Sequence, residues 1–268
     1  MEKVSVIIPT YNRGAKLLAS VNSVLQQTYS DMEILIVDDC STDNTRELVE
    51  KIRDNRIKYI NLPKNLGASG ARNAGAKYAE NSIIAFNDSD DLWKPEKLEK
   101  QMNYWQEHPE FAMIYCEYQM HRPEKTYMIP DPELSGDLEG DIFPWLLLRN
   151  SIGTPTMLMY RDCFLEVGGF DVTLRSLEDW DFAIRFAEKF QIGYVEEPLV
   201  DAQYSEGGVS SAVGVYYESR CKMIAAYKEQ MLACGVFDAV VNDLFRRAQN
   251  RDMLETVKKM LMLLLAQE

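Results

Sequence analysis

The chain has 268 residues, of which 46% are hydrophobic and 26% are charged, proportions that are ordinary for a globular protein. This length allows one large α/β domain, or one domain with a small appendage. The formal net charge of −13 argues against a general nucleic-acid partner, because such proteins neutralise phosphates with lysine and arginine. A single bound nucleotide is not excluded, because a local cluster of cations can oppose the global charge.

The five cysteines are scattered and show no C-x-x-C spacing, so we expect free thiols rather than disulfides or a zinc site. Free thiols are typical of a reducing cytoplasm, and no run of about 20 apolar residues predicts a spanning helix. We therefore expect a cytoplasmic location. The apolar stretch at 260–266 follows two lysines. It could dock at the inner face of the membrane, pack onto the core, or form the seam of a homodimer.

The first half of the chain alternates compact apolar segments with amphipathic ones. Strands are expected at residues 4–9, 33–37, 57–61 and 83–86, and helices at residues 16–27, 42–53 and 68–79. This alternation predicts an α/β fold with a Rossmann-like, mostly parallel central sheet flanked by helices. Ligands bind such sheets beyond the carboxyl ends of the strands, so the residues just after each strand are the functional candidates.

The second half of the chain is less regular. Residues 123–144 combine prolines and glycines with acidic residues and are expected to form a long loop. Further elements are expected as strands at 156–160 and 193–196, a turn at 167–170 and a helix at 178–189. Residues 213–267 are expected to be almost wholly helical. We therefore divide the chain into a domain of residues 1–212, with halves 1–116 and 117–212, and a helical C-terminal extension of residues 213–268.

Polar residues follow the first three strands. The first strand ends in Pro9, Thr10, Tyr11, Asn12 and Arg13. Asp38 and Asp39 follow the second strand, where a carboxylate can accept hydrogen bonds from a base or ribose. A turn or a helix cap is the alternative role for this pair. Arg72, in the helix after the third strand, would place a fixed cation near a nucleotide.

The fourth strand is followed by Asp88, Ser89, Asp90 and Asp91. Three carboxylates within four residues repel one another unless a cation or strong donors stand between them. Hard oxygen ligands at the edge of a parallel sheet suit Mg²⁺ or Mn²⁺, which often bridge to phosphate. The simpler alternative is an acidic helix N-terminus, but the polar residues after the other strands favour a metal site.

A second acidic cluster contains Glu178, Asp179, Trp180 and Asp181 at the start of a predicted helix. A carboxylate here could cap the helix, or it could serve as the general base for an acceptor hydroxyl. Trp180 and Glu178 are the candidates for contact with that acceptor. One base, one metal ion and an in-line attack would give inversion at the reacting carbon.

Taken together, these segments resemble the family 2 glycosyltransferases, which have the GT-A fold. The matching stretches are VSVIIPTYNR at 4–13, IVDDCSTDNT at 36–45, NLGASGARNAG at 65–75, NDSDDLWKPEKL at 87–98 and VGGFD…LEDWDFAIR at 167–185. Each stretch is degenerate alone, but they occur in the family's order and together cover residues 1–200.

The resemblance implies roles for individual residues. Residues 1–116 would bind the nucleotide-sugar, usually a UDP-sugar, and residues 117–212 would face the acceptor. Donor-binding residues would be Pro9, Thr10, Tyr11, Asn12, Asp39, Arg72, Asp88 and Ser89. Asp88 and Asp90 would hold Mn²⁺ or Mg²⁺ in a DXD-type motif, Asp179 would be the catalytic base, and Glu178 and Trp180 would contact the acceptor.

Two departures from the family pattern refine these expectations. No Q-x-x-R-W motif follows the expected base, so we expect transfer of a single sugar to a glycan, lipid-linked or protein acceptor. Many relatives carry a histidine near the position of Tyr204, and here Glu206 is the only candidate to replace it. A non-catalytic scaffold and a sugar nucleotidyltransferase are the rival interpretations. The first has little reason to keep Asp39, Asp90 and Asp179, and the second needs a basic Gly-rich loop after the first strand.

Overall fold

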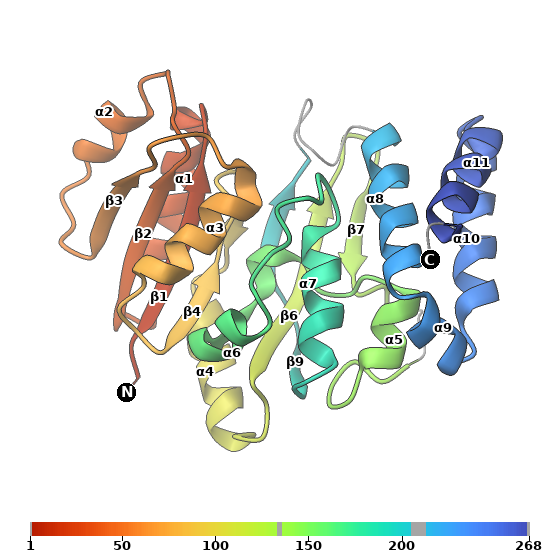
Figure 1. Cartoon of the computed structure of the whole chain (residues 1–268). Coiled ribbons are helices and arrows are strands. Elements are labelled where there is room, and N and C mark those ends of the chain that lie inside the picture. Colours follow the sequence, from red (N-terminus) through yellow and green to blue (C-terminus); the bar gives the residue numbers. More distant parts are fainter. Residues whose placement is uncertain (1, 133–135, 205–212, 267–268) are drawn as a thin grey trace.

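A computed structural model describes residues 2–132, 136–204 and 213–266, and within them nine strands form one sheet. The strand order is β3-β2-β1-β4-β8-β6-β9-β5, with β7 paired to β6 (Figure 1). The strands are β1 (Val4–Thr10), β2 (Met32–Asp38), β3 (Ile57–Asn61), β4 (Ile83–Phe86), β5 (Leu92–Trp93), β6 (Met113–His121), β7 (Thr126–Ile129), β8 (Leu158–Tyr160) and β9 (Ile192–Gln203).

Helices flank this sheet and fill the C-terminal part of the chain (Figure 1). They are α1 (Gly14–Leu25), α2 (Thr45–Glu50), α3 (Gly67–Tyr78), α4 (Lys97–Glu107), α5 (Phe143–Leu148), α6 (Arg161–Glu166), α7 (Glu178–Ala187), α8 (Val213–Ala226), α9 (Lys228–Ala233), α10 (Phe237–Gln249) and α11 (Leu254–Leu265), with a 3₁₀ turn, η1, at Thr154–Thr156.

The directions of the strands explain where a ligand site can form. β1 pairs in parallel with β2 and β4, and β3 pairs in parallel with β2. β8 runs antiparallel to both β4 and β6, so β6 and its parallel partner β9 point the same way as β4. The α/β fold is as predicted, but the sheet is mixed, because β5, β7 and β8 run in the opposite direction.

Alternation along the strands divides the apolar core between the two faces of the sheet. In β1, Val6 and Ile8 pack on one face with Leu17 of α1 and Leu98 of α4. Ile7, between them, packs on the other face in a cluster that includes side chains of α3, α6 and α7. The run at 4–10 is apolar on both sides because both faces are covered, which is typical of buried strands of a parallel sheet.

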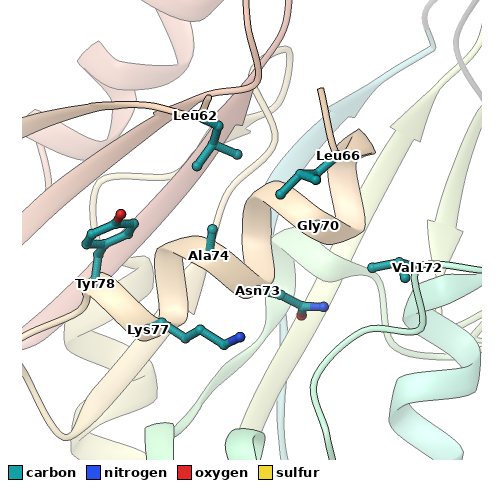
Figure 2. A pocket seen from close by; sticks show the side chains of 8 residues that line it. All are labelled: Leu62, Leu66, Gly70, Asn73, Ala74, Lys77, Tyr78 and Val172. Carbon is teal, nitrogen blue, oxygen red and sulfur yellow. The ribbon is translucent and has the colours of Figure 1, made fainter. Parts of the chain in front are cut away.

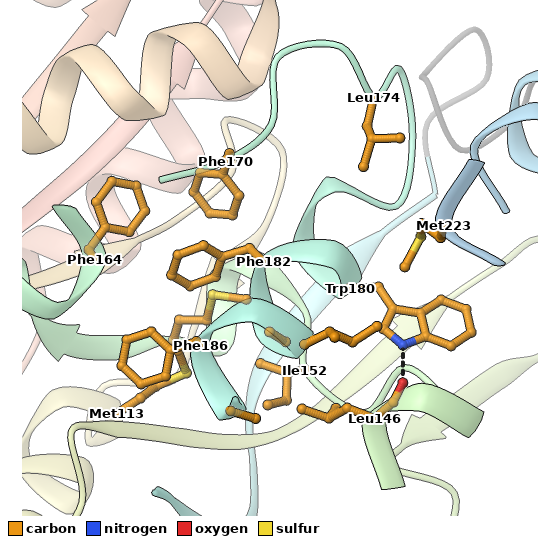
Figure 3. Close-up of a cluster of buried hydrophobic side chains, with 14 of the residues drawn as sticks. Met113, Leu146, Ile152, Phe164, Phe170, Leu174, Trp180, Phe182, Phe186 and Met223 are labelled. Atoms are coloured by element: carbon orange, nitrogen blue, oxygen red, sulfur yellow. Dashed lines mark hydrogen bonds between the residues drawn. The ribbon is translucent and has the colours of Figure 1, made fainter. Parts of the chain in front are cut away.

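The hydrophobic cluster on the face of the sheet that contains Ile7 extends into the C-terminal helices. Phe164, Phe170, Phe182 and Phe186 form its aromatic centre, and Met223 of α8 lies beside Trp180 (Figure 3). Side chains of α10 and α11 are buried in the same cluster. The chain from residue 213 is helical as predicted, apart from short turns. The stretch at 260–266 presents Leu261 to the core and leaves others of its apolar side chains exposed.

Three elements differ from the sequence-based expectation. The second helix is only Thr45–Glu50, and the expected loop at 123–144 contains β7, which forms a hairpin with β6. The last strand is Ile192–Gln203 rather than a short piece at 193–196. Glu196, Glu197 and Pro198 interrupt the alternation of apolar and polar residues along β9. The pairing of β9 with β6 accommodates them through a shift in register. Cys116 pairs with Val195, but the next residue of β6, Glu117, pairs with Pro198.

Among the described residues, no helix is long and apolar enough to cross a membrane.

The close packing of α3 on the sheet gives a first prediction. A Cβ at Gly75 would lie 2.4 Å from Cγ2 of Ile7 and 3.1 Å from Cγ2 of Val37. We expect Gly75→Ala to lower the free energy of unfolding by about 1–3 kcal/mol, because both neighbours are fixed in the sheet. Chemical denaturation measures this change.

The matched control is Gly214→Ala in α8, where no described atom outside its own helix segment lies within 4 Å of the added Cβ. This change should be neutral or stabilising by up to about 1 kcal/mol. Equal losses in the two variants would contradict the packing argument.

Candidate functional site

A cavity of about 660 Å³ lies beyond the carboxyl ends of β1, β2, β4, β6 and β9. It therefore occupies the position that the strand directions favour. Ten of the residues expected at the site from sequence line it, namely Pro9, Thr10, Tyr11, Asp39, Arg72, Asp88, Ser89, Asp90, Glu178 and Asp179. Residues that are up to 170 positions apart in the chain (9 to 179) thus meet in one place.

Asp39 joins the end of β2 to the start of α3. Its two carboxylate oxygens accept hydrogen bonds from the backbone N–H groups of Leu66, at 2.7 Å, and Gly67, at 2.8 Å. Gly67 has a φ of +74°, a left-handed conformation that favours glycine. Burial, with a smaller effect of Asp38, raises the pKa of Asp39 despite these donors. A carboxylate has about four lone-pair sites, so Asp39 can still accept a hydrogen bond from a ligand.

Arg72 connects the two halves of the site. Its guanidinium donates to Asp88 Oδ1, at 2.5 Å, and to Glu178 Oε1, at 3.0 Å. Only 4% of Arg72 is exposed. Burial opposes its charge, but the fields of Asp88 and Glu178 outweigh this effect and raise its pKa. The pairing keeps two carboxylates from different halves of the chain beside one cation.

The acidic residues after β4 hold excess negative charge. Arg13 pairs with Asp90 through Nη1 and Oδ2, at 2.6 Å. The neighbouring Asp91 is buried and accepts from the backbone N–H of Gln203, at 2.9 Å. Desolvation, followed by repulsion from Asp88, raises the pKa of Asp91 well above its ordinary range. Such crowding is what a bound cation would relieve.

The donor set fits a magnesium-type ion rather than a preformed protein cage. Within the described ranges, no group of three or more His, Cys, Asp or Glu side chains is arranged to hold a metal ion. Mg²⁺ is usually bound through one or two carboxylates together with substrate phosphates and water. Asp88 and Asp90 both line the cavity and could supply those two carboxylates.

Asp179 is the carboxylate with the clearest signature of a general base. Burial, followed by repulsion from Glu178, raises its pKa to about 7 from an ordinary value of 3.8. Its Oδ1 accepts from the backbone N–H of Trp180, at 2.7 Å, and Asn150 also donates to it. A carboxyl with a pKa near 7 is well matched to proton transfer at neutral pH.

The start of α7, which carries Asp179, is held by its neighbours. Leu177 has a left-handed φ of +65°, a conformation that costs a non-glycine residue energy and that surrounding contacts must impose. Upstream, Asn73 of α3 donates to the Phe170 carbonyl, at 2.8 Å, and accepts from the Phe170 N–H, at 2.9 Å. A Cβ on Gly169 would lie 2.6 Å from Asn73 Oδ1, so a side chain at this position would disturb the two hydrogen bonds between Asn73 and Phe170.

Two expected site residues, Asn12 and Trp180, are not among the residues that line the cavity. Asn12 instead accepts from the backbone N–H of Thr42, at 2.7 Å, and so braces the turn after β2. Trp180 is only 6% exposed, and its indole donates to the Leu146 carbonyl, at 2.6 Å (Figure 3). Arg220 covers its ring at 3.8 Å from the centroid. The structure thus places the side chain of Asn12 against a turn and the ring of Trp180 in the core, and their contacts with donor and acceptor stay predictions. Glu206 lies outside the described residues.

The cavity also contains residues that were not singled out from sequence. The main examples are Tyr118, Met120, Arg122, Asn150, Gln203 and Tyr216. Arg13, which was expected at the end of the first strand without a role of its own, also lines the cavity. The β6 residues had no signal, because the strand that presents them was not recognised.

A second hollow, of about 470 Å³, lies on the outer face of α3 (Figure 2). Leu62, Leu66, Tyr78 and Val172 are the larger apolar side chains around it, and Lys77 contributes a charge. The lining residues include no carboxylate. The candidate carboxylates for acid–base or metal chemistry are therefore those of the larger cavity.

Comparison with known proteins agrees with this geometry. A family model described as Glycosyl transferase family 2 matches residues 5–168, which is more than half of the chain. The chain belongs to this glycosyltransferase family. An uncharacterized glycosyltransferase of Haemophilus influenzae is 35% identical over 204 residues, which cover 73% of this chain and 66% of that protein. A Rickettsia felis relative is 38% identical, but the match spans only 33% of its length.

A solved structure supports the GT-A fold. S. aureus TarS residues 1–349, in complex with UDP-GlcNAc, gives a TM-score of 0.66 at 26% identity and covers 84% of this chain and 66% of that chain. In the family 2 chain described here, the cavity at the carboxyl ends of the strands is therefore the expected place for a glycosyltransferase site.

The Arg72 network gives a second prediction. We expect Arg72→Gln to lower the free energy of unfolding by about 3 kcal/mol, because it leaves Asp88 and Glu178 unpaired in a partly buried acidic site. Urea denaturation followed by circular dichroism measures the change.

Lys77→Gln is the control, since Lys77 is an exposed cation on the same helix. It should change stability by no more than about 0.5 kcal/mol. If the two variants lost the same stability, the ion pairs of Arg72 would not be holding the site together.

Proposed function

We propose that this chain transfers a single sugar from a UDP-sugar to an acceptor hydroxyl, with inversion at the anomeric carbon. The observation that carries the proposal is the shared cavity of Asp179 and the acidic pair Asp88 and Asp90. It places a candidate base and a candidate phosphate–metal site in one space. Family membership supports the transferase class.

The donor would lie over the ends of β1, β2 and β4. Asp39 would accept a hydrogen bond from the base, and Thr10 and Tyr11 would line the same pocket. Two comparisons support a uridine nucleotide: TarS was solved with UDP-GlcNAc, and the E. coli protein WfgD is named a UDP-Glc-dependent glucosyltransferase. WfgD is 49% identical over 100 residues, which cover 37% of this chain and 40% of that protein.

Asp88 and Asp90 would hold Mn²⁺ or Mg²⁺ together with the donor diphosphate. A divalent cation there would supply Lewis-acid stabilisation of the departing diphosphate. Arg72 and Arg13 would keep the two carboxylates in position, since each arginine is paired with one of them.

The chemical step would be an in-line displacement. The acceptor oxygen forms a bond to the anomeric carbon while Asp179 takes its proton. The bond between that carbon and the diphosphate oxygen breaks on the opposite face, and the electron pair leaves with the nucleoside diphosphate. One displacement of this kind inverts the configuration.

The acceptor would be a sugar linked through diphosphate to a lipid. The name of WfgD specifies α-D-GlcNAc-diphosphoundecaprenol as its acceptor, as does that of its E. coli counterpart WfaP, which is 41% identical over 129 residues. Such an acceptor would place this chain in the synthesis of a cell-surface polysaccharide or glycoconjugate.

A thermal-shift panel tests the donor site. UDP, GDP, dTDP, CDP and ADP are each added with Mn²⁺ or with EDTA, and a ligand that binds only the native state raises the melting temperature. We expect a metal-dependent rise with UDP alone, and Asp90→Asn should remove the metal-dependent part. Asp162→Asn, at an exposed position outside the cavity, is the control. No shift with any diphosphate would favour the non-catalytic scaffold.

The role of Asp179 is tested by Asp179→Asn. We expect transfer to fall by at least a hundredfold while UDP binding persists, because the amide cannot accept the proton at neutral pH. Glu188→Gln, near the end of the same helix, should keep wild-type turnover. Turnover by Asp179→Asn near the wild-type rate would contradict the assignment.

The raised pKa adds a pH signature. In the wild type, kcat/KM should rise with pH through about 7, as Asp179 loses its proton. The native state also holds this proton more tightly than the unfolded chain, so ionising Asp179 removes stability between about pH 4 and pH 7. Asp179→Asn should therefore gain stability relative to the wild type as pH rises through that range.

A further inference from the structure

Arg122 lies at the acceptor side of the cavity, at the end of β6. Tyr118, Met120 and Arg122 are spaced two residues apart, and all three line the cavity. This spacing is the one by which a strand presents side chains on one face. Arg122 directly follows the last residue of β6 and lies about 13 Å along the strand from Tyr118 at 3.3 Å per residue.

The charge around Arg122 differs from that around the other cavity arginines. Three cationic side chains line the cavity among the described residues: Arg13, Arg72 and Arg122. Arg13 and Arg72 are paired with carboxylates of the cavity. In the described part of the chain, Arg122 is paired with no carboxylate, and its guanidinium instead lies near two aromatic rings.

Two tyrosines hold the guanidinium in place. Its central carbon lies 5.9 Å from the ring centroid of Tyr127 and 5.7 Å from that of Tyr204. Such contacts stabilise the cation through ring faces without using its N–H donors. Neither tyrosine lines the cavity, so they hold the arginine from outside while its side chain faces the space.

Arg122 is also electrostatically connected to the proposed base through Tyr118. Burial raises the pKa of the Tyr118 hydroxyl, Asp179 and Asp91 add to this rise, and Arg122 opposes it. The fields of base and arginine therefore meet at one hydroxyl. Tyr118, Arg122 and Asp179 also line the same cavity, so one acceptor could contact both the base and the arginine.

Apolar side chains line the cavity along the end of β6. Met120 lies opposite Ala202 of β9, Tyr118 lies opposite Ile129 of β7, and all four side chains line the cavity. A cation beside an apolar wall suits a ligand that joins an anionic group to a hydrocarbon chain. A guanidinium is well matched to phosphate oxygens, because its planar fork donates two parallel hydrogen bonds.

We propose that Arg122 binds the phosphate of the acceptor and thereby selects acceptors whose sugar is joined to a prenyl lipid through diphosphate. This assignment rests on the proposed function and names the residue that distinguishes a charged lipid-linked acceptor from a neutral glycan. In the proposed function the donor phosphates would instead lie beside Asp88, Asp90 and Arg72.

Calorimetric binding of farnesyl diphosphate tests the assignment, with UDP and Mg²⁺ saturating so that the donor site is filled. The proteins are the wild type, Arg122→Gln, Arg122→Lys and Lys125→Gln. Lys125 is the matched control, because it is a cation of the same hairpin that does not line the cavity. Farnesol and inorganic pyrophosphate are the two comparison ligands.

We expect Arg122→Gln to weaken farnesyl diphosphate binding at least tenfold, with unchanged melting temperature and UDP binding. Arg122→Lys should recover part of the loss, because the charge remains and the fork is gone. Lys125→Gln should bind as the wild type does. Farnesol and inorganic pyrophosphate should each bind the wild type more weakly than farnesyl diphosphate does. Farnesol should bind Arg122→Gln as tightly as it binds the wild type.

Several results would overturn the inference. They are absence of farnesyl diphosphate binding to the wild type, equal affinity in Arg122→Gln, an equal loss in Lys125→Gln, or farnesol binding as tight as that of the diphosphate. If UDP binds all four proteins, such a result removes the role of Arg122 alone. If UDP fails to bind the wild type, the proposed function falls and the inference falls with it.

Discussion

The site depends on one buried cation in an acidic environment. Among the described residues, six carboxylates line the cavity, those of Asp39, Asp88, Asp90, Asp91, Glu178 and Asp179. Carboxylates at this density repel one another in a partly desolvated space, and Arg72 opposes that repulsion at its centre. Asp88 follows β4 and Glu178 begins α7. The same interaction that offsets the repulsion therefore also fixes the spacing between the two halves of the site.

The remaining charge is divided between the two sides of the cavity. On the side of β1, β2 and β4, carboxylates are paired with arginines or with backbone N–H groups, as Asp39 is at the start of α3. On the side of β6 and β9, one arginine stands among apolar and aromatic residues. Asp179 lies between them with a pKa near 7. One side is thus suited to a cation and a diphosphate, and the other to an anion on a lipid.

Much of the donor side could be predicted from sequence, because its residues directly follow strands whose apolar character is unbroken. Asp39, Asp88 and Asp90 are examples, and their meeting at one edge follows from parallel strands alone. The acceptor side could not be predicted in the same way. Tyr118 belongs to β6 and Arg122 directly follows it. The pairing of β6 depends on β9, and Glu196, Glu197 and Pro198 conceal that partner in the sequence. Trp180 and Asn12 show a further limit, since neighbouring residues in a motif can face the core or a turn instead of the ligand.

The shifted register between β6 and β9 restricts how the length of this chain can vary. β9 has more residues than β6 in this region, because Cys116 pairs with Val195, Glu117 with Pro198 and Tyr118 with Val200. This shift places Gln203 where its backbone N–H donates to Asp91. Because side chains alternate between faces, loss of one residue from 196–199 would turn Ala202 and Gln203 to the opposite sides of the sheet. The turn between β6 and β7 faces no such requirement at its tip. Insertions and deletions among natural relatives should therefore accumulate in the hairpin and be absent from this part of β9.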